Sequence, residues 1–482
     1  MFVIMCGSAC LLLANLGNQY LWEDEAQTAL VSKTILTEGV PRGYDGKNYF
    51  SQEGSAEYGD NYIWRWHTWL PFYVLAGFYK LFGISTFVAR LPFVLFGIGT
   101  VLLTYFFAKA LWPGGRVPAI AAALLAISVP FLLLCRQCRY HSMAMFFSML
   151  SLYAYVALLH GRKYSAVMLF VASTLLFHSQ HIYVVVLFGA VLLHAVIFGR
   201  PRLKILLVVT FITIIVNAPW LVWLAGMHYP HQFMLISFLN TYVTDIVRYV
   251  FPVWLLLVVL IVVFARRVRT GRFLSGDRRF WERVSLPVFF VTFNVIIVAT
   301  LSPLIFFRYV APAIPLLILL IAVIVDAAAG VHWLLAVATT ALLLATSQLK
   351  DYFYEITHDY DGPMKGISRY LNEHGSSEDV VAITYGDMPL KFYTNMRVIG
   401  GLTGEDLEPT RNARWVIIRK YVLCSEDKKV RRYLLKNIDR SKYRKIMLNS
   451  PDITWENRED PRNHLFRTRQ NEDKVVIYER ID

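Results

Sequence analysis

Long uncharged apolar stretches recur along this chain of 482 residues and constrain its fold more than any other feature. A stretch of about 17 to 25 apolar residues has the length of a helix that crosses a bilayer, and the sequence contains about eleven of them. They lie near residues 2–18, 84–109, 117–134, 141–160, 164–180, 182–198, 203–225, 250–265, 285–302, 309–326 and 331–349. Hydrophobic residues make up 56% of the chain and charged residues only 17%. This composition is too apolar for a soluble protein, so the sequence predicts a polytopic α-helical membrane protein.

Basic residues gather in the loops on one side of the predicted spans. They are Lys109, Arg116, Arg162, Lys163, Arg200, Arg202, Lys204 and the arginines of 266–283. The positive-inside rule places these loops in the cytoplasm, which puts the long segment 18–83 on the outside. This topology, together with anionic lipid headgroups, accounts for the net charge of +14. We therefore expect the lipid bilayer, and no nucleic acid, as the partner of the basic residues.

The chain changes character at about Lys350, where the apolar spans stop and charged residues become frequent. Short strand-like and helix-like runs then alternate, at 380–384, 415–418 and 475–478 and at 364–374 and 428–437. This alternation predicts a soluble α/β domain over 350–482, and an odd number of spans places it outside. We expect residues 1–349 to form a transmembrane domain that includes the external loop 18–83.

Three carboxylates, Glu23, Asp24 and Glu25, are the first charged residues that follow the first apolar span. A partly desolvated carboxylate at a membrane boundary is placed to take a proton from a hydroxyl group. Acidic residues also favour the first turn of a helix, so a helix cap is the alternative interpretation.

Aromatic side chains are dense in the external loop that follows these carboxylates. Such residues are typical of membrane interfaces, and they also stack on the faces of sugars. Their density favours interfacial helices that lie flat over a cavity. They are Tyr44, Tyr49, Phe50, Tyr58, Tyr62, Trp64, Trp66 and Trp69.

The five cysteines are an odd number and do not indicate a disulfide framework. Cys135 and Cys138 form a C-x-x-C pair without a second pair elsewhere, which is weak evidence for a metal site. Two small residues on one helix face are the simpler interpretation.

Several short motifs, taken in order, resemble the GT-C superfamily of glycosyltransferases that use polyprenyl-phosphate sugars. This superfamily includes bacterial relatives of the protein O-mannosyltransferases and the lipid A aminoarabinose transferase. The motifs are Asp24-Glu25-Ala26, Leu81-Phe-Gly83, Ala89-Arg-Leu-Pro92, Cys138-Arg-Tyr-His141, Phe177-His-Ser-Gln-His181, Phe307-Arg-Tyr-Val-Ala-Pro312 and Tyr385-Gly-Asp-Met-Pro-Leu-Lys-Phe-Tyr393. The resemblance covers nearly the whole chain and implies the GT-C fold.

One stretch departs from the motifs of these relatives. Many of them have a Lys-Pro-Pro-Leu-like run before the second span, where this chain has Trp64-Arg-Trp-His-Thr-Trp-Leu-Pro71. The basic and proline elements of that run survive only partly in this chain, as Arg65, His67 and Pro71. The sugar and acceptor of the relatives are therefore not carried over to this chain.

The resemblance implies an enzyme of the bacterial inner membrane that transfers a sugar from a polyprenyl phosphate to an extracytoplasmic acceptor hydroxyl. Asp24 matches the first-loop aspartate of the family and is the expected general base. Glu25 would orient the acceptor or hold an adjacent basic group. Expected substrate-binding residues, besides Arg65 and His67, are Arg139, Tyr140, His178, His181, Arg308 and Tyr309.

Arg139 and Arg308 fall at the predicted outer ends of spans, where an arginine fork matches the oxygens of the leaving phosphate. Snorkelling of these side chains to lipid headgroups is the alternative interpretation.

No cofactor is required by the sequence. A divalent metal is an open alternative, because some relatives bind one and Glu25, His67, His178 and His181 are available as ligands. No ligand spacing in the sequence demands a metal.

A secondary transporter of a lipid-linked sugar is the alternative from a different functional class. Transporters usually have internal repeats and broken helices with polar residues at mid-membrane, and we find no convincing repeat. The identities of the sugar and of the acceptor are not encoded in any motif.

Overall fold

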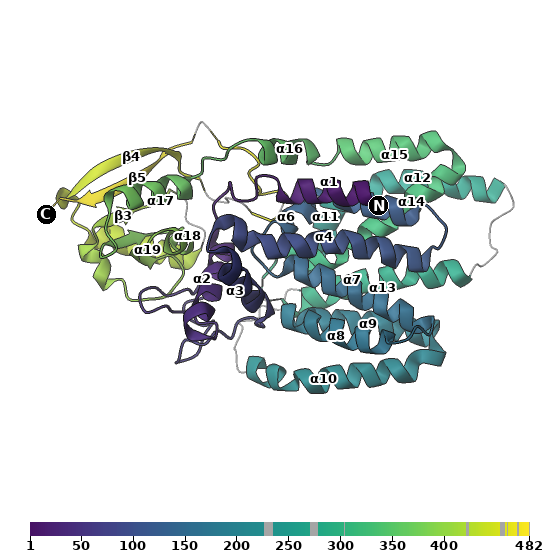
Figure 1. The fold of residues 1–482 in the computed structure, drawn as a ribbon. Helices are drawn as coiled ribbons and strands as arrows, with labels where there is room; N and C mark the ends of the chain where they lie inside the picture. The colour runs from purple at the N-terminus through teal and green to yellow at the C-terminus, as the bar shows by residue number, and fades with distance from the viewer. Residues whose placement is uncertain are drawn as a thin grey trace. The chain divides into compact units, whose positions relative to one another are not determined.

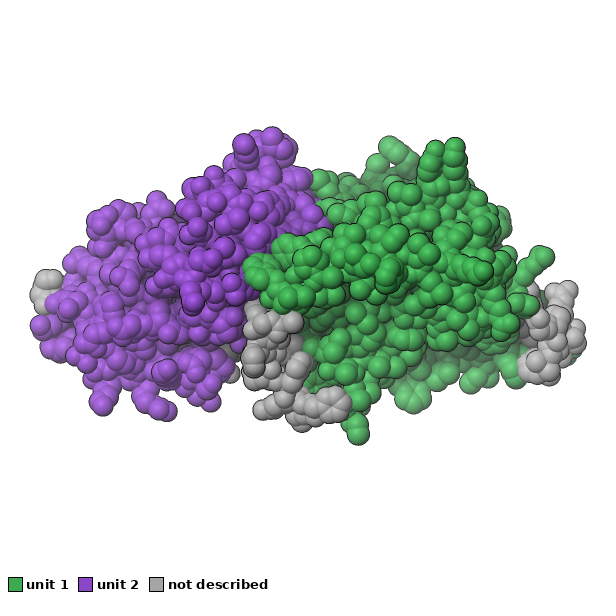
Figure 2. Space-filling model, turned by 90° about the horizontal axis from the view of Figure 1, so that it is seen from below, with its two compact units in different colours: residues 1–14, 93–353, 459–461 green, residues 15–92, 354–458, 462–482 purple. Residues whose placement is uncertain are grey.

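A computed structural model describes residues 1–225, 235–269, 278–302, 304–420, 424–453, 458–459, 461–469 and 472–481. Its contacts divide the chain into two compact units (Figure 2), of which the first contains residues 1–14, 93–353 and 459–461. The second contains residues 15–92, 354–458 and 462–482. The first external loop thus belongs to the same unit as the C-terminal residues, whereas the sequence suggests including it in the transmembrane part.

The first unit consists of helices packed along one another (Figure 1). Within the described residues they are α1 (Phe2–Leu13), α4 (Thr86–Leu111), α5 (Val117–Ala126), α6 (Val129–Cys135), α7 (His141–Leu159), α8 (Ser165–Ser179), α9 (Ile182–Ile197), η1 (Arg200–Arg202), α10 (Leu203–Ala225), α11 (Leu235–Tyr249), α12 (Val253–Arg269), α13 (Arg278–Leu301), η2 (Phe307–Ala313), α14 (Ile314–Val331), α15 (Trp333–Ala345) and α16 (Leu349–Thr357). Two of these helices are divided between the units: α4 begins in the second unit and enters the first after its internal Pro92, and α16 passes into the second unit after Phe353.

Every predicted span coincides with helical structure. Among the described residues, five helices are long and apolar enough to cross a membrane, or up to eight if each bent pair counts as one span. One such pair is α5 and α6, which meet at a bend of 62° where Pro130 begins the second helix. Helices α1, α8 and α9 are apolar but shorter. The number of spans therefore remains a prediction.

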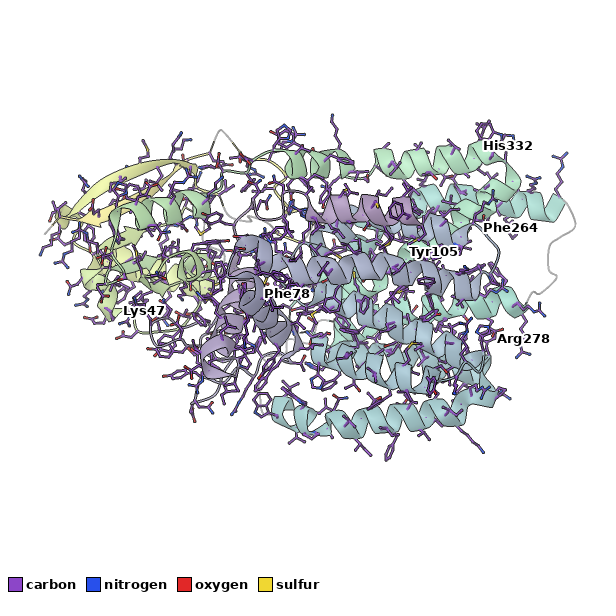
Figure 3. All side chains as sticks on the ribbon, in the orientation of Figure 1. Lys47, Phe78, Tyr105, Phe264, Arg278 and His332 are labelled. Atoms are coloured by element: carbon purple, nitrogen blue, oxygen red, sulfur yellow. The ribbon has the colours of Figure 1, made fainter. Side chains whose placement is uncertain are left out.

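The outer surface of the first unit is apolar. Phe2 and Trp254 are 81% exposed, and Phe264, labelled in Figure 3, is 55% exposed. Exposed side chains of this kind over many helices would be unfavourable in water and are the expected lipid-facing surface of an integral membrane protein.

The second unit contains two helices from the first external loop and a small α/β domain. Its remaining elements are α2 (Glu23–Glu38), α3 (Leu70–Phe82), α17 (Pro363–His374), β1 (Val380–Ile383), α18 (Asp387–Tyr393), β2 (Arg397–Gly400), η3 (Glu408–Asn412), β3 (Trp415–Ile417), α19 (Ser425–Asn437), η4 (Arg440–Lys442), β4 (Tyr443–Pro451) and β5 (Lys474–Arg480). The strands that the sequence predicts are β1, β3 and β5, whereas β2 and β4 were not predicted.

The five strands form one mixed sheet in the order β2-β1-β3-β5-β4. Strand β1 is parallel to β2 and β3, with Ala382 opposite Val416, and β5 is antiparallel to β3 and β4. Alternate residues face opposite sides of a strand. Accordingly, Val381 and Ile383 pack with α17 and α18, while Ala382 and Val416 pack against α19 on the other face.

Candidate active site

Helix α2 begins directly at the three carboxylates. Trp22 precedes it in extended conformation, and all three acidic side chains lie in the first turn, where the helix dipole stabilises negative charge. The helix ends at Gly39, whose φ of 75° is the left-handed conformation that glycine adopts without strain. The three carboxylates therefore lie in the first turn of a helix, as the helix-cap interpretation expects. Glu23, Asp24 and Glu25 are, however, only 5%, 8% and 0% exposed. A cap alone does not require such burial.

Glu25 forms a buried, two-pronged ion pair with Arg90. Arg90 donates from Nε to one carboxylate oxygen at 2.8 Å and from Nη2 to the other at 2.7 Å. Its Nη1 also donates to the carbonyl oxygens of Leu16 and Gln19. Arg90 therefore fixes the chain that leads into α2. Of the two roles expected for Glu25, holding a basic group is the one that this contact provides.

Glu23 lies beside a second buried ion pair, in which Lys391 donates to Asp387 at 2.7 Å. Lys391 also donates to the carbonyl oxygen of Tyr49 at 2.8 Å. Burial, followed by the charge of Asp387, raises the pKa of Glu23 well above its usual value. A side chain at Gly401 would place its Cβ 1.7 Å from the Asp387 carboxylate, so the pair fits only against a glycine.

Asp24 faces Glu53 and Tyr385. Partial burial, and then the charge of Asp24, raises the pKa of Glu53. Burial also raises the pKa of Tyr385, whose surroundings include Arg458 and the carboxylates of Glu23 and Asp24. The guanidinium of Arg458 lies 4.4 Å from the ring centre of Trp22. Asp24 is thus buried close to other carboxylates, a tyrosine and a basic group.

Arg65 and His67 lie in the loop between the last β-bridge of the external segment and α3. The backbone N–H of Arg65 donates to the Glu57 carbonyl at 2.8 Å, and the indole of Trp69 donates to the Trp64 carbonyl at 2.9 Å. Both side chains are half-buried. Glu57 is buried, and its pKa is raised to about 7 because burial outweighs its hydrogen bonds from Ser51 and Gln27.

In the first unit, Arg139 and Tyr140 precede α7 and lie near Arg308 and Tyr309 of η2. Burial raises the pKa of Tyr140, and the nearby groups that act on it are Tyr309, Arg308 and Arg139. Each arginine is only 6% exposed. Neither side chain therefore extends along the outer surface, as the snorkelling alternative requires.

Arg308 contacts an acidic and an aromatic side chain. It donates from Nη1 to Glu459 at 3.1 Å, and its guanidinium lies 4.1 Å from the ring centre of Phe306. Glu459 is buried and has no sequence motif that marks it. A guanidinium that is already paired with a carboxylate can bind an oxyanion with its remaining N–H groups.

His178 and His181 flank the end of α8. The ring of His178 packs edge-on against Trp220 at 5.3 Å. Burial lowers the pKa of His181 to about 4, and its Nδ1 is buried without a hydrogen-bond partner among the described residues. His181 is therefore a neutral group at physiological pH. Its neighbour Tyr183 donates to the carbonyl of Tyr309, which links this break to η2.

The described part of the chain contains no group of three or more His, Cys, Asp or Glu side chains that could hold a metal ion. Cys135 and Cys138 are buried and do not form a disulfide.

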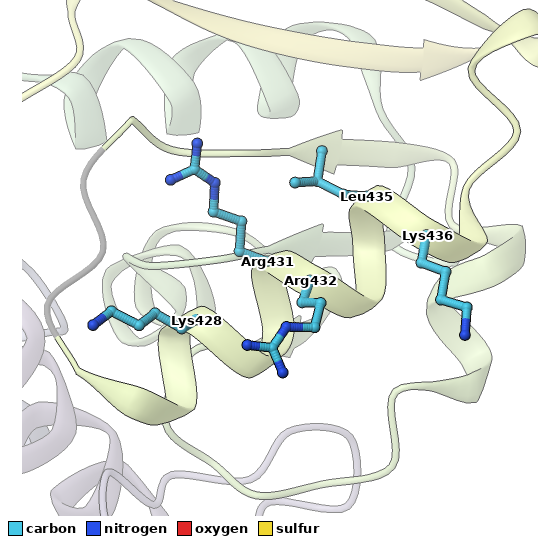
Figure 4. Close-up of a pocket in the computed structure, with 5 residues that line it drawn as sticks. All are labelled: Lys428, Arg431, Arg432, Leu435 and Lys436. Atoms are coloured by element: carbon cyan, nitrogen blue, oxygen red, sulfur yellow. The ribbon is translucent and has the colours of Figure 1, made fainter.

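A separate basic surface lies on α19. Lys428, Arg431, Arg432 and Lys436 project around a shallow hollow beside Leu435 (Figure 4). These side chains share neighbouring turns of one helix and can attract anions without forming a closed site.

Three comparisons relate this chain to known proteins. The family model of dolichyl-phosphate-mannose-protein mannosyltransferases matches residues 66–223, which is less than half of the chain. No curated protein matches the sequence.

Solved structures match over much more of the chain. ArnT from Cupriavidus metallidurans bound to undecaprenyl phosphate is similar with a TM-score of 0.61 and 13% identity, over 99% of this chain and 97% of that one. The Archaeoglobus fulgidus oligosaccharyltransferase tethered with an acceptor peptide is similar with a TM-score of 0.54 and 11% identity, over 92% of this chain and 69% of that one. At these identities the likeness establishes the fold.

Proposed function

We propose that this chain is a membrane glycosyltransferase of the GT-C superfamily, which is supported by the similarity of its fold to ArnT and to the archaeal oligosaccharyltransferase. Its donor is a sugar linked to a polyprenyl phosphate, and its acceptor is a hydroxyl group outside the cytoplasm. The observation that carries the proposal is the burial of Asp24 in the first turn of α2, next to a carboxylate that is held by Arg90. The solved ArnT structure contains undecaprenyl phosphate, which supports the donor class.

The chemistry assigns each group a role. The Asp24 carboxylate takes the proton of the acceptor hydroxyl, whose oxygen then bonds to the anomeric carbon. The bond from that carbon to the phosphate oxygen breaks, and polyprenyl phosphate leaves with the electron pair. A positioned general base contributes about 10² to 10⁴-fold to the rate.

Arg139 and Arg308 are assigned to the departing phosphate, which gains charge as the sugar leaves. Tyr140 and Tyr309 are assigned hydroxyl contacts to the same group, and His181 acts as a neutral partner. Glu25 and Arg90 are assigned as positioning residues, because their ion pair and the hydrogen bonds of Arg90 to backbone carbonyls fix the start of α2.

A donor-release assay tests this function. Purified full-length protein in nanodiscs is incubated with radiolabelled polyprenyl-phosphate sugar and an acceptor extract. We expect free polyprenyl phosphate to accumulate. A secondary transporter would instead return the donor intact on the other side of the membrane, and that result would overturn the proposal.

A further inference from the structure

A cavity of about 550 Å³ opens between the first external loop and the C-terminal α/β domain, within the second unit. Its lining includes Tyr49, Tyr58, Tyr62, Arg397, Glu405 and Asp406. None of these residues belongs to the proposed chemical step. The cavity has the size of a small-molecule site and combines aromatic faces with a few polar groups.

The tyrosines form a connected cluster. The rings of Tyr44 and Tyr49 are stacked with centres 4.5 Å apart, and the ring of Tyr62 is tilted at 5.9 Å from Tyr49 and 5.7 Å from Tyr58. All four side chains are partly exposed. Their faces carry negative partial charge and attract the positively polarised C–H groups of a sugar ring.

Hydrogen bonds hold this cluster in place. Lys47, labelled in Figure 3, donates to the carbonyl oxygens of Ser377 and Asn395 at 2.8 and 2.7 Å. Asn48 donates to the Met396 carbonyl and accepts from the Val398 N–H. The loop that carries Tyr44 and Tyr49 is thus fixed to the edge of the sheet at β2, and the cavity is preformed.

The polar groups of the cavity favour hydroxyl and amino groups over anions. Glu405, Asp406 and Asp60 supply three carboxylates, against one guanidinium from Arg397. Burial raises the pKa of Glu405, whose carboxylate also accepts from Thr403 at 3.1 Å. An interfacial aromatic belt, the other interpretation of these tyrosines, does not require carboxylates among the rings.

We propose that this cavity binds a neutral or amino-bearing sugar unit of a glycan acceptor. The inference rests on the proposed transferase function and narrows its acceptor class from any hydroxyl compound to a carbohydrate. Tyr49 and Tyr62 stack on the sugar ring, while Glu405, Asp406 and Arg397 contact its hydroxyl or amino groups.

Saccharide binding to the full chain in nanodiscs tests the proposal, by saturation-transfer NMR and calorimetry. The probes are mannobiose, which is neutral, chitobiose, which carries amines, and digalacturonate, which is acidic. We expect the first or second to bind and the third to bind much more weakly. Tyr62→Ala should weaken binding at least about fivefold, as expected for the loss of one aromatic partner. Tyr164→Ala, at an exposed tyrosine of the first unit, should leave binding unchanged.

Asp406→Asn changes an exposed residue and serves where Tyr62→Ala fails to fold. Asp406→Asn should weaken the binding of chitobiose more than the binding of mannobiose. Equal saccharide binding by wild type, Tyr62→Ala and Asp406→Asn would overturn the proposal, as would preferential binding of digalacturonate or of a hydroxyl-bearing peptide.

Release of polyprenyl phosphate in the presence of the acceptor extract, measured for wild type and for the same variants, separates this inference from the proposed function. If the wild type releases no polyprenyl phosphate, the proposed function is contradicted. Intact release with unaltered saccharide binding in the variants contradicts only the cavity.

Discussion

Arg90 binds both carboxylate oxygens of Glu25, at 2.8 and 2.7 Å, with neither side chain more than 3% exposed. Its remaining N–H groups reach backbone carbonyls in the segment before α2. The residue adjacent to the proposed base is thus locked, and the first turn of α2 has one defined position. Preorganisation of this kind is what a general base requires.

Arg90→Met should therefore destabilise the protein strongly, because removing one partner of a buried pair leaves an unpaired charge and costs about 3–5 kcal/mol. Thermal unfolding in nanodiscs measures the loss. Arg116→Met is the matched control, since Arg116 pairs with Asp326 at 3.0 Å on an exposed surface. Equal unfolding temperatures for the two variants would contradict the structural role of Arg90.

The free energy of unfolding of Glu23→Gln, relative to that of wild type, should increase as the pH rises above about 4.5. The pKa of Glu23 is raised in the folded protein by burial and by Asp387. The folded state then holds a proton that the unfolded state releases, so wild-type stability falls with rising pH while the amide does not titrate. Unfolding temperatures from pH 4 to 8 measure the difference.

Glu38→Gln on the same helix is the control for that series, because Glu38 is exposed and forms a solvent-exposed pair with Arg42 at 3.5 Å. A stability difference for Glu23→Gln that does not grow with pH would show that Glu23 has an ordinary pKa.

Arg308→Lys should lower kcat/KM at least about tenfold, or roughly 1.4 kcal/mol, because lysine cannot reproduce the planar fork. A lower kcat with little change in KM would mean that Arg308 acts on the leaving phosphate in the transition state. Glu459→Gln should cost less, since it leaves the guanidinium in place and removes only its partner. Wild-type kinetics for Arg308→Lys would remove the phosphate role.

Membrane topology is testable by cysteine labelling in a cysteine-free background. A cysteine at Lys163 should react only after the inner face is opened, and a cysteine at Ser377 should react in intact spheroplasts. This expectation follows from the positive-inside rule, which places the basic loops, including the one with Lys163, in the cytoplasm. Labelling of both positions only after the inner face is opened would place the α/β domain in the cytoplasm.

Periodicity and composition were sufficient to predict the helices, because a bilayer span needs a long uncharged stretch that is visible in one sequence window. Strands β1, β3 and β5 were also visible as short β-branched runs. Strand β2 (Arg397–Gly400) was missed because it is short and begins at a charge, and β4 because two consecutive charges, Arg444 and Lys445, follow its first residue. Helix α11 was missed since it is amphipathic rather than uniformly apolar.

The partners of the site residues could not be predicted in the same way. Arg90 stands in the quoted motif Ala89-Arg-Leu-Pro92, yet its pairing with Glu25 joins residues 65 positions apart. Asp387 and Lys391 have the i,i+4 spacing of a helical ion pair, a signal that was available. Glu459 reaches Arg308 from 151 positions away, and no local pattern indicates such a contact.

The central claim is that Asp24 is the base of a glycosyl transfer from a lipid phosphate, and one measurement tests it directly. Release of polyprenyl phosphate is followed with purified wild type, Asp24→Asn and the control Glu38→Gln, together with donor binding. The substitution at Asp24 is nearly isosteric and removes only basicity. We predict full donor binding by all three proteins and at least about a hundredfold slower release by Asp24→Asn, as the loss of a general base requires. Release by Asp24→Asn at more than about a tenth of the wild-type rate would contradict the account.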